Sequence, residues 1–300
     1  MLFSSMTFIF VFLPFVCLLY FLSNKFLSNK KIQNYILLIA SLLFYAWGEP
    51  YYLLTMLFVI VINYSGAILI EHYKNNKKSL LFFIISINLA CLFYFKYSNF
   101  FIENINNIFN TYLFLPKIIM PIGISFYTFQ AISYIIDVYL ENVKAQKDFF
   151  KLSLYITLFP QLVAGPIVKY HNVSEQISNR VVNFDKIVYG VKRFIIGLAK
   201  KVLIANTLGS VADKIFSQPV DAFNPLISWI GAISYSFQLF YDFSGYSDMA
   251  IGLGSIFGFK FLENFNYPYI SKSIIEFWRR WHISLSSWFK QYLYIPLGGK

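Results

Sequence analysis

Charged side chains are scarce in this chain. Lys, Arg, Asp and Glu together make up 13% of its 300 residues, whereas hydrophobic residues make up 58%, and the mean hydropathy is +0.58. Soluble domains contain about 25% charged residues, so the composition excludes an ordinary soluble enzyme and indicates a polytopic membrane protein. Long uncharged runs recur along the chain, and about 20 apolar residues suffice for a helix to cross the hydrocarbon core.

Cysteine is nearly absent, and familiar catalytic signatures are missing. Cys17 and Cys91 lie in apolar runs without CxxC spacing, which predicts small core residues rather than metal or redox chemistry. The sequence has no GxSxG elbow, no HExxH and no P-loop, and Gly252 and Gly254 do not follow a strand, so they do not form a dinucleotide site. We expect these glycines to permit close helix packing. No metal site and no bound cofactor are predicted.

Acidic residues are also few, at 14 against 25 Lys and Arg, which gives a net charge of +11. In a membrane protein, an excess of Lys and Arg marks the cytoplasmic loops. The charge therefore reports topology, and we expect the lipid bilayer as a partner and no nucleic acid.

The first half of the chain predicts five spans. Lysine clusters at 25–31 and 74–78 follow the first and third spans, which places the N-terminus outside and both clusters in the cytoplasm. Residues 96–117, with five asparagines and Pro116, are predicted to form an external loop. The predicted spans are 1–24, 32–48, 50–70, 79–95 and 118–136.

Residues 152–168 are long enough to span, but Pro160, Gly165 and Pro166 interrupt them. If this segment crossed, seven basic residues between Lys169 and Lys201 would lie outside. We therefore expect a re-entrant or broken segment, with 159–166 lining a cavity. Residues 202–212 are too short to span and 222–241 form a full span, so the number of crossings after residue 152 stays open.

Asp242 and Asp248 flank the turn-like run YDFSGYSD between two apolar segments. Carboxylates at membrane depth are costly unless they are paired or hydrated, which makes both candidates for function. The alternative is that they lie at the interface and cap helices, with Asp248 as the N-cap of a helix that begins at Met249.

The last stretch, FWRRWHISLSSWFKQYLYIPLGGK, covers residues 277–300 and mixes cations with aromatic residues. At helical spacing, apolar side chains from Phe277 to Phe289 share one face, while Arg279, Arg280 and Lys290 fall elsewhere. This pattern predicts an amphipathic helix parallel to the membrane interface.

His282 is one of three histidines in the chain. An imidazole with its ordinary pKa of about 6.5 suits general-base catalysis, and an interfacial structural role is the alternative. His72 and His171 are expected to be solvated loop residues.

Eight motifs, taken in order, resemble those of the membrane-bound O-acyltransferases, in the branch of the alginate O-acetylation membrane subunit and the teichoic acid D-alanyl transfer protein. They are FLPFV (12–16), SLLFYAWGEP (41–50), PIGISFYTFQAISYIIDVY (121–139), FPQLVAGPI (159–167), YDFSGYSDMAIGLG (241–254), NFNYPY (264–269), FWRRWHISLSSWF (277–289) and YIPLGG (294–299).

The resemblance implies an all-α, polytopic protein in which residues 1–300 form a single membrane domain. Its helices would form a ring with re-entrant segments around a thin partition pierced by a tunnel. The implied location is the cytoplasmic membrane of a bacterium. The implied activity is transfer of an acetyl group from a cytoplasmic thioester, acetyl-CoA or an acyl carrier, toward an exported polysaccharide or peptidoglycan. An extracytoplasmic acetyltransferase and a cytoplasmic acyl carrier are the implied partners.

His282 matches the histidine of the family's WRRWH motif, and Arg279 and Arg280 suit a phosphate of the donor because guanidinium binds phosphate bidentately. A second family histidine lies in a later apolar segment, beyond Lys300, so activity is expected of the full-length relative rather than of residues 1–300 alone. Further residues expected at the donor site or tunnel are Trp278, Trp281, Trp288, Tyr241, Asp242, Ser244, Asp248, Gln161 and Pro166.

Three other functions remain open at this point. A D-alanyl transferase differs only in its donor. A transporter or channel would use the broken segment and the acidic pair as its pathway, and a non-catalytic scaffold would dock a carrier protein on its basic face. Dependence on a thioester separates the transferases from the other two.

Overall fold

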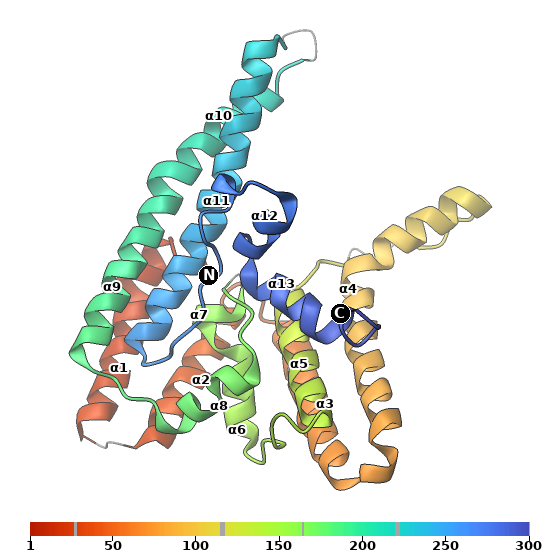
Figure 1. The fold of residues 1–300 in the computed structure, drawn as a ribbon, viewed down its shortest axis with the longest axis vertical. Helices are drawn as coiled ribbons and strands as arrows, with labels where there is room; N and C mark the ends of the chain where they lie inside the picture. The colour runs from red at the N-terminus through yellow and green to blue at the C-terminus, as the bar shows by residue number, and fades with distance from the viewer. Residues whose placement is uncertain (27–28, 115–117, 164, 220–222, 300) are drawn as a thin grey trace. The chain divides into compact units, whose positions relative to one another are not determined.

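The computed structural model describes residues 1–26, 29–114, 118–163, 165–219 and 223–299 (Figure 1). These residues form helices and no strand, so the predicted all-α class is confirmed. Four of the described helices are long and apolar enough to cross a membrane, namely Phe8–Phe26, Leu53–His72, Lys74–Phe109 and Phe184–Phe216. Three of them coincide with the predicted spans 1–24, 50–70 and 79–95.

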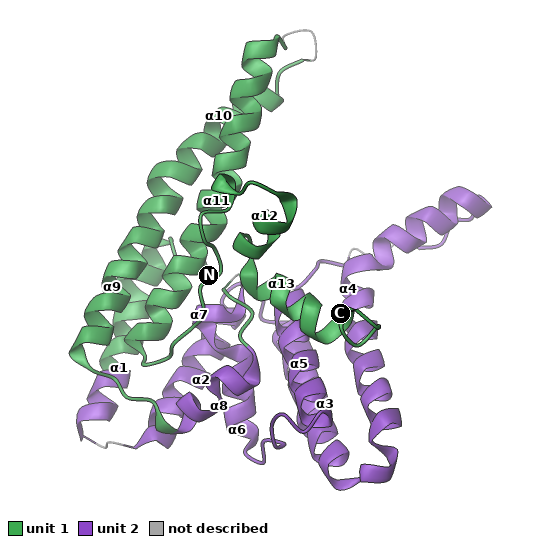
Figure 2. Cartoon of the chain, viewed as in Figure 1, with its two compact units in different colours: residues 1–18, 164–168, 179–300 green, residues 19–163, 169–178 purple. Residues whose placement is uncertain are grey.

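The chain packs as two compact units (Figure 2). Unit 1 holds residues 1–18, 164–168 and 179–300, and unit 2 holds residues 19–163 and 169–178. A single membrane domain can contain two packing units, so the predicted domain organisation stays a prediction.

Unit 2 is built around two groups of packed helices. Helices α3, α4 and α5 contact one another, and α2 contacts α6 and α7. Between α3 and α4 the buried amides of Asn63 and Asn88 donate to each other at 2.8 and 3.2 Å, which satisfies two polar groups inside an apolar pair of helices. The helices are α1 (Leu13–Phe26, whose first residues belong to unit 1), α2 (Lys30–Ala46), α3 (Leu53–His72), α4 (Lys77–Phe109), α5 (Ile124–Tyr139), α6 (Phe149–Thr157), α7 (Phe159–Leu162) and α8 (Tyr170–Asn179).

The loop predicted at 96–117 is wrong over most of its length, because α4 continues to Phe109. Its asparagines do not break the helix: Asn104 Nδ2 donates to the carbonyl oxygen of Phe100 one turn back. The helix ends only at Asn110, which adopts the left-handed conformation at φ 48°. Pro116 lies outside the described residues.

Two breaks in unit 2 follow from proline and glycine. Helix α5 begins at Ile124, later than the predicted start of the fifth span, because Gly123 has φ +75° and Pro121 precedes it. The predicted break in 152–168 is confirmed, since α6 ends at Thr157 and Pro160 lies in the first turn of the short α7.

Unit 1 is dominated by two long antiparallel helices (Figure 1). Helix α9, a π-helical segment and α10 run on as one helix, Phe184–Phe216, so residues 202–212 are part of a membrane-length helix and not a short separate one. Helix α11 runs unbroken through YDFSGYSD, so the expected turn is wrong. The elements are η1 (Phe8–Phe12), α9 (Phe184–Ala199), η3 (Lys200–Ala205), α10 (Asn206–Phe216), α11 (Pro225–Ile256), η5 (Pro268–Ile270), α12 (Ile274–Arg280), α13 (Ile283–Phe289) and η6 (Lys290–Tyr294).

Glycines set the distance between α9 and α11. A Cβ atom at Gly252 would lie 2.6 Å from the carbonyl oxygen of Gly190, and one at Gly197 would lie 2.5 Å from that of Gly245. The backbones therefore touch at two levels, as the sequence predicts for Gly252. A Cβ atom at Gly254 would instead lie 2.6 Å from a ring atom of Phe261.

The predicted single helix at 277–289 is divided in two. Helix α12 ends at Arg280, His282 has φ +44°, and α13 begins at Ile283. The shared apolar face expected from Phe277 to Phe289 is therefore broken, because the left-handed residue changes the direction of the chain.

Replacing Gly252 with Ala should lower the free energy of unfolding by about 1–3 kcal/mol, because the new methyl group meets backbone atoms that cannot move aside. The measurement is the unfolding midpoint of the purified protein in detergent. Gly231→Ala is the matched control, since its methyl group would meet Ile215 and Phe216 side-chain atoms, which can shift. Equal losses in the two variants would show that the backbone contact of α9 and α11 does not limit their packing.

Candidate functional site

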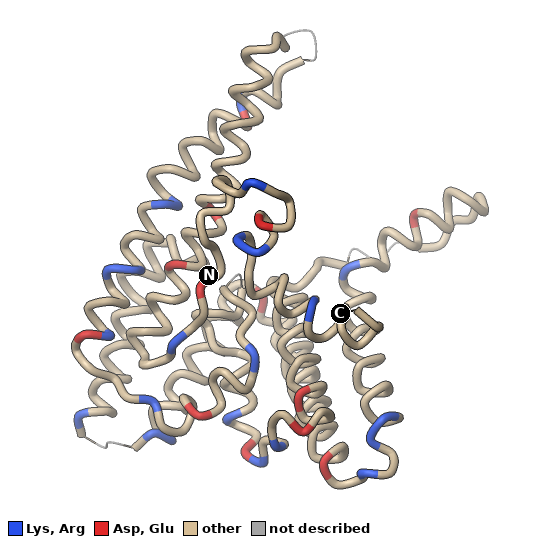
Figure 3. The backbone as a smooth tube through the Cα atoms, viewed as in Figure 1, with Lys and Arg blue, Asp and Glu red and all other residues tan. Residues whose placement is uncertain are grey.

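Ion pairs join α9 and its continuation η3 to α11 inside unit 1. Asp248, in the interior of α11, accepts from Arg193 Nε at 2.9 Å and from Lys200 Nζ at 2.6 Å. Arg193 also bonds Glu263 through Nη2, at 2.5 Å. The next residue of η3, Lys201, pairs with Asp242 of α11. Figure 3 shows the basic positions spaced along the first helix and acidic positions on the second.

Helix α11 corrects one expectation. Asp248 is not the N-cap of a helix that begins at Met249, because α11 passes through it. The basic residues 192, 193, 200 and 201 lie on one long helix, and three of them are ion-paired. Each pair neutralises a charge that would otherwise be costly in an apolar helix.

A cavity of about 770 Å³ opens beside these ion pairs. Its volume lies within the range of about 300–1,000 Å³ typical of ligand pockets. The hydroxyl groups of Ser244 and Ser247 lie in its wall, are buried, and have no hydrogen-bond partner among the described residues. The lining residues are Arg193, Ile196, Lys200, Phe240, Tyr241, Ser244, Ser247, Asp248, Glu263, Phe265, Asn266, Tyr267 and Ile283.

His282 lies next to this cavity, since its chain neighbour Ile283 and its ring neighbour Phe265 both line it. Its ring is buried and makes an edge contact with the ring of Phe243 at 4.7 Å. His282 Nδ1 lies 3.1 Å from Oδ1 of the fully buried Asn264.

The surroundings of Asn264 determine the tautomer of His282. The backbone N–H of Ser284 points at the same Asn264 atom at 3.2 Å, and an N–H can only donate, so that atom is the amide oxygen. Nδ1 of His282 must therefore carry the proton and donate, which leaves the lone pair on Nε2. A neutral imidazole with its lone pair on Nε2 is the form that a general base needs.

Ser284 extends this network to the end of the broken segment. Its hydroxyl donates to Asn264 Oδ1 at 2.8 Å and accepts from the backbone N–H of Ile167 at 3.0 Å. Pro166 is buried and directly precedes Ile167, whose N–H makes this hydrogen bond to Ser284. Gln161 belongs to unit 2, where its amide donates to the carbonyl oxygen of Tyr155 at 2.6 Å.

The aromatic residues predicted for the site have different environments. Trp281 stacks on Phe277 at 5.6 Å and makes an edge contact with Phe265 at 5.1 Å. Trp288 is buried and packs on Tyr292, whereas Trp278 is exposed.

The two arginines of the WRRWH motif also differ. Arg280 pairs with Glu276 at 2.8 Å and donates to the carbonyl oxygen of Asn266 at 3.2 Å, so its guanidinium is already engaged. Arg279 is exposed at the surface of unit 1. Of the two, Arg279 is the one whose guanidinium faces solvent.

Several residues of the site were not singled out from the sequence. Asn264 lies in the quoted NFNYPY motif, but its role depends on the fold, as does that of Ser284. Arg193 and Lys200 were counted only among the basic residues that follow the broken segment. Their spacing of seven residues, which places them on one helix face, was the signal that could have identified them.

Comparison with known proteins gives one consistent result. The model of the membrane-bound O-acyltransferase family (MBOAT) matches residues 144–300. The probable alginate O-acetylase AlgI of Pseudomonas aeruginosa is 45% identical over 308 residues, which cover all of this chain and 58% of that protein. The peptidoglycan O-acetyltransferase of Helicobacter pylori is 39% identical over 328 residues, covering all of this chain and 62% of that protein.

A more distant similarity connects the chain to D-alanyl transfer. The teichoic acid D-alanyltransferase of Bacillus subtilis is 34% identical over 183 residues, which cover 60% of this chain and 46% of that protein. The chain thus spans about three fifths of the length of the acetylases it matches.

The burial of His282 predicts a pH dependence of stability. Desolvation lowers the pKa of His282 from 6.5 to about 4. Between these values the unfolded chain takes up a proton that the folded protein does not, so stability falls as the pH falls from 6.5 toward 4. Between pH 7 and pH 5 this histidine should account for a loss of about 2 kcal/mol.

Unfolding of the wild type and of His282→Gln at both pH values provides the test, because Gln cannot titrate but can still donate to Asn264. The wild type should lose more stability than the variant. An identical loss in both proteins would mean that His282 is not held neutral by its surroundings.

Proposed function

Because the chain belongs to the membrane-bound O-acyltransferase family, we propose that it transfers an acetyl group from a thioester toward a hydroxyl group of an exported polysaccharide or of peptidoglycan. Relatives named as alginate O-acetylase and peptidoglycan O-acetyltransferase match it over its whole length. The observation that carries the proposal is the buried His282, whose proton is fixed on Nδ1 by Asn264 and whose neighbours Ile283 and Phe265 line a cavity.

In this reaction His282 Nε2 accepts the proton of the attacking hydroxyl group. The hydroxyl oxygen forms a bond with the thioester carbonyl carbon, the carbon–sulfur bond breaks, and the thiolate leaves with the proton returned by His282. Asn264 acts as a positioning residue. Its amide oxygen accepts from the N–H at Nδ1 and so stabilises the imidazolium that forms when Nε2 takes up the proton. The hydroxyls of Ser244 and Ser247 are donors within the same cavity wall.

The cavity suits an uncharged part of the donor. Its two cations, Arg193 and Lys200, are matched by two carboxylates, Asp248 and Glu263, so it has no excess positive charge for a phosphate. The pantetheine arm and thioester shared by acetyl-CoA and acyl carriers are uncharged and carry amides that can pair with serine hydroxyls. Arg279 is the proposed contact for the donor's phosphate.

An acetyl donor is favoured over a D-alanyl donor. The acetylases match the whole chain at 39–45% identity, whereas the D-alanyltransferase matches 60% of it at 34%. Acetyl-CoA and an acyl carrier both have the arm that fits the cavity, so the proposal includes either donor.

The location and partners belong to the same proposal. All the relatives named above are bacterial, and four described helices have membrane length, so we place the protein in the bacterial cytoplasmic membrane. A cytoplasmic acyl carrier would deliver the donor, and an extracytoplasmic acetyltransferase would complete transfer to the polymer.

Replacing His282 with Gln in the chromosomal gene should reduce O-acetylation of the exported polymer by about 10²–10⁴-fold, which is the contribution of a general base. The acetyl content of the isolated polysaccharide and peptidoglycan is the measurement, with the amount of protein in the membrane checked by immunoblot. His72→Gln is the matched control, because His72 is exposed and distant in the chain from the cavity residues. Normal acetylation in the His282 variant, at normal protein levels, would rule out His282 as the base.

A further inference from the structure

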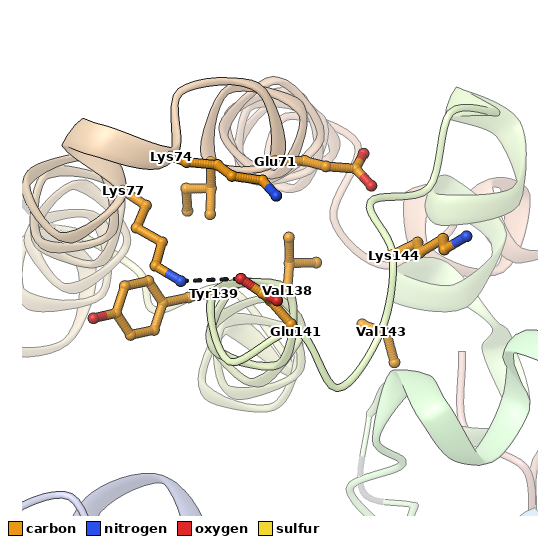
Figure 4. A pocket seen from close by; sticks show the side chains of 9 residues that line it. Glu71, Lys74, Lys77, Val138, Tyr139, Glu141, Val143 and Lys144 are labelled. Atoms are coloured by element: carbon orange, nitrogen blue, oxygen red, sulfur yellow. Dashed lines mark hydrogen bonds and ion pairs between the residues drawn. The ribbon is translucent and has the colours of Figure 1, made fainter.

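Unit 2 contains a second cavity, of about 310 Å³, where α3 ends, α4 begins and α5 ends (Figure 4). Three lysines and two glutamates line it, together with Tyr139 and three aliphatic side chains. None of these residues belongs to the site proposed for acyl transfer. The charged residues are Lys74, Lys77, Lys144, Glu71 and Glu141.

The cavity lining carries more positive than negative charge. Lys77 Nζ bonds Glu141 Oε1 at 3.1 Å and lies 5.2 Å from the centre of the Tyr139 ring. Lys74 also extends toward the middle of the cavity (Figure 4), and it forms no hydrogen bond or ion pair with the described residues. The hydrogen bond from Lys77, with the charges of Lys77 and Lys74, lowers the pKa of Glu141. Counting Glu71 and Lys144, three ammonium groups and two carboxylates line the cavity.

The start of α4 adds positive potential to the same place. Helix α4 has 33 residues, and its N-cap residue Asn76 makes no side-chain hydrogen bond to the first turn. The uncapped N–H groups and the helix dipole favour an anion beside Lys77. The helix N-terminus therefore adds a smaller positive potential to the charge of the two lysines.

The cavity also lies at the ends of two helices of membrane length. It is formed where two helices of membrane length meet, Leu53–His72 and Lys74–Phe109, and its aliphatic residues Ile70 and Val138 belong to the ends of α3 and α5. A cavity with ammonium groups and an aliphatic wall at the end of membrane helices matches a phosphate with an attached acyl chain. Basic pockets between membrane helices bind anionic headgroups in this way.

We propose that the cavity formed by Lys74, Lys77 and the ends of α3 and α5 binds the headgroup phosphate of an anionic phospholipid. The phosphate contacts Lys74 and the first turn of α4, and part of an acyl chain lies along Ile70 and Val138. Glu141 opposes this binding, because it occupies Lys77 and repels the phosphate.

Native mass spectrometry of the purified chain tests the proposal, with phosphatidylglycerol and phosphatidylcholine of identical acyl chains as probes. The wild type should bind phosphatidylglycerol more tightly. Lys74→Gln should weaken that binding about fivefold, the contribution of one lysine near an anionic headgroup, and Glu141→Gln should strengthen it. Lys78→Gln is the matched control, since Lys78 is an exposed neighbour that does not line the cavity, and it should change binding less than twofold.

Opposite signs in the Lys74 and Glu141 variants cannot come from misfolding, which would weaken binding in both. Equal weakening by Lys74→Gln and Lys78→Gln would overturn the proposal in favour of diffuse surface charge. Equal affinity for the two lipids would overturn it as well. Glycerol phosphate, added as a competitor, should not displace the lipid at concentrations far above that of the lipid, and full displacement would assign the cavity to a free phosphate ligand instead.

Discussion

The carboxylate of Asp248 is the group on which the arrangement of unit 1 depends. A carboxylate in the interior of a largely apolar helix is stable only if cations reach it, and removing one partner of a buried pair typically costs about 3–5 kcal/mol. Arg193 and Lys200 reach it because α9 and α11 touch backbone to backbone at Gly190 and Gly252 and again at Gly197 and Gly245. Larger residues at these positions would separate the helices and leave the charges unpaired. Close packing and charge pairing are therefore one constraint, and the wall of the cavity is its product.

The hydrogen bonds among His282, Asn264 and Ser284 also hold separate segments together, but through uncharged groups. Three segments meet through Ser284, namely the end of the broken segment at Ile167, the NFNYPY motif at Asn264 and the start of α13. The left-handed conformation of His282 makes this meeting possible, because it ends α12 and lets Ser284 direct its N–H back to Asn264. A continuous helix, as the periodicity of the sequence predicted, would place His282 and Ser284 on different faces. The break in the helix is thus what assembles the site.

Composition and periodicity sufficed for the class of the fold, and the motifs sufficed for the family. The broken segment was found because Pro160 leaves a signal that acts locally. The errors have two causes. In the 96–109 region, which is largely exposed, the asparagines do not end the helix, because Asn104 bonds the Phe100 carbonyl of its own helix. The YDFSGYSD and 277–289 runs are instead decided by contacts with residues distant in the chain. Ser244 is a poor helix residue in isolation, yet the long α11 includes it, and the partner of Lys200 lies 48 residues away in the chain.

The motif WRRWH suggested one place for binding both the thioester arm and the phosphate of the donor. The balanced charges of the cavity separate these two roles. Arginines beside His282 suggested a phosphate site within the same cluster, but Arg280 is held by Glu276 and by the Asn266 carbonyl. Inside the cavity each cation has its carboxylate, so a phosphate entering it would have to displace Asp248 or Glu263 and leave that carboxylate without its partner. An uncharged arm incurs no such cost, and His282 stays neutral next to it because burial removes its ring from water. This balance supports the proposal that a thioester group lies inside the cavity and the charged part of the donor outside. It also distinguishes this cavity from the one at Lys74, which three lysines and two glutamates line.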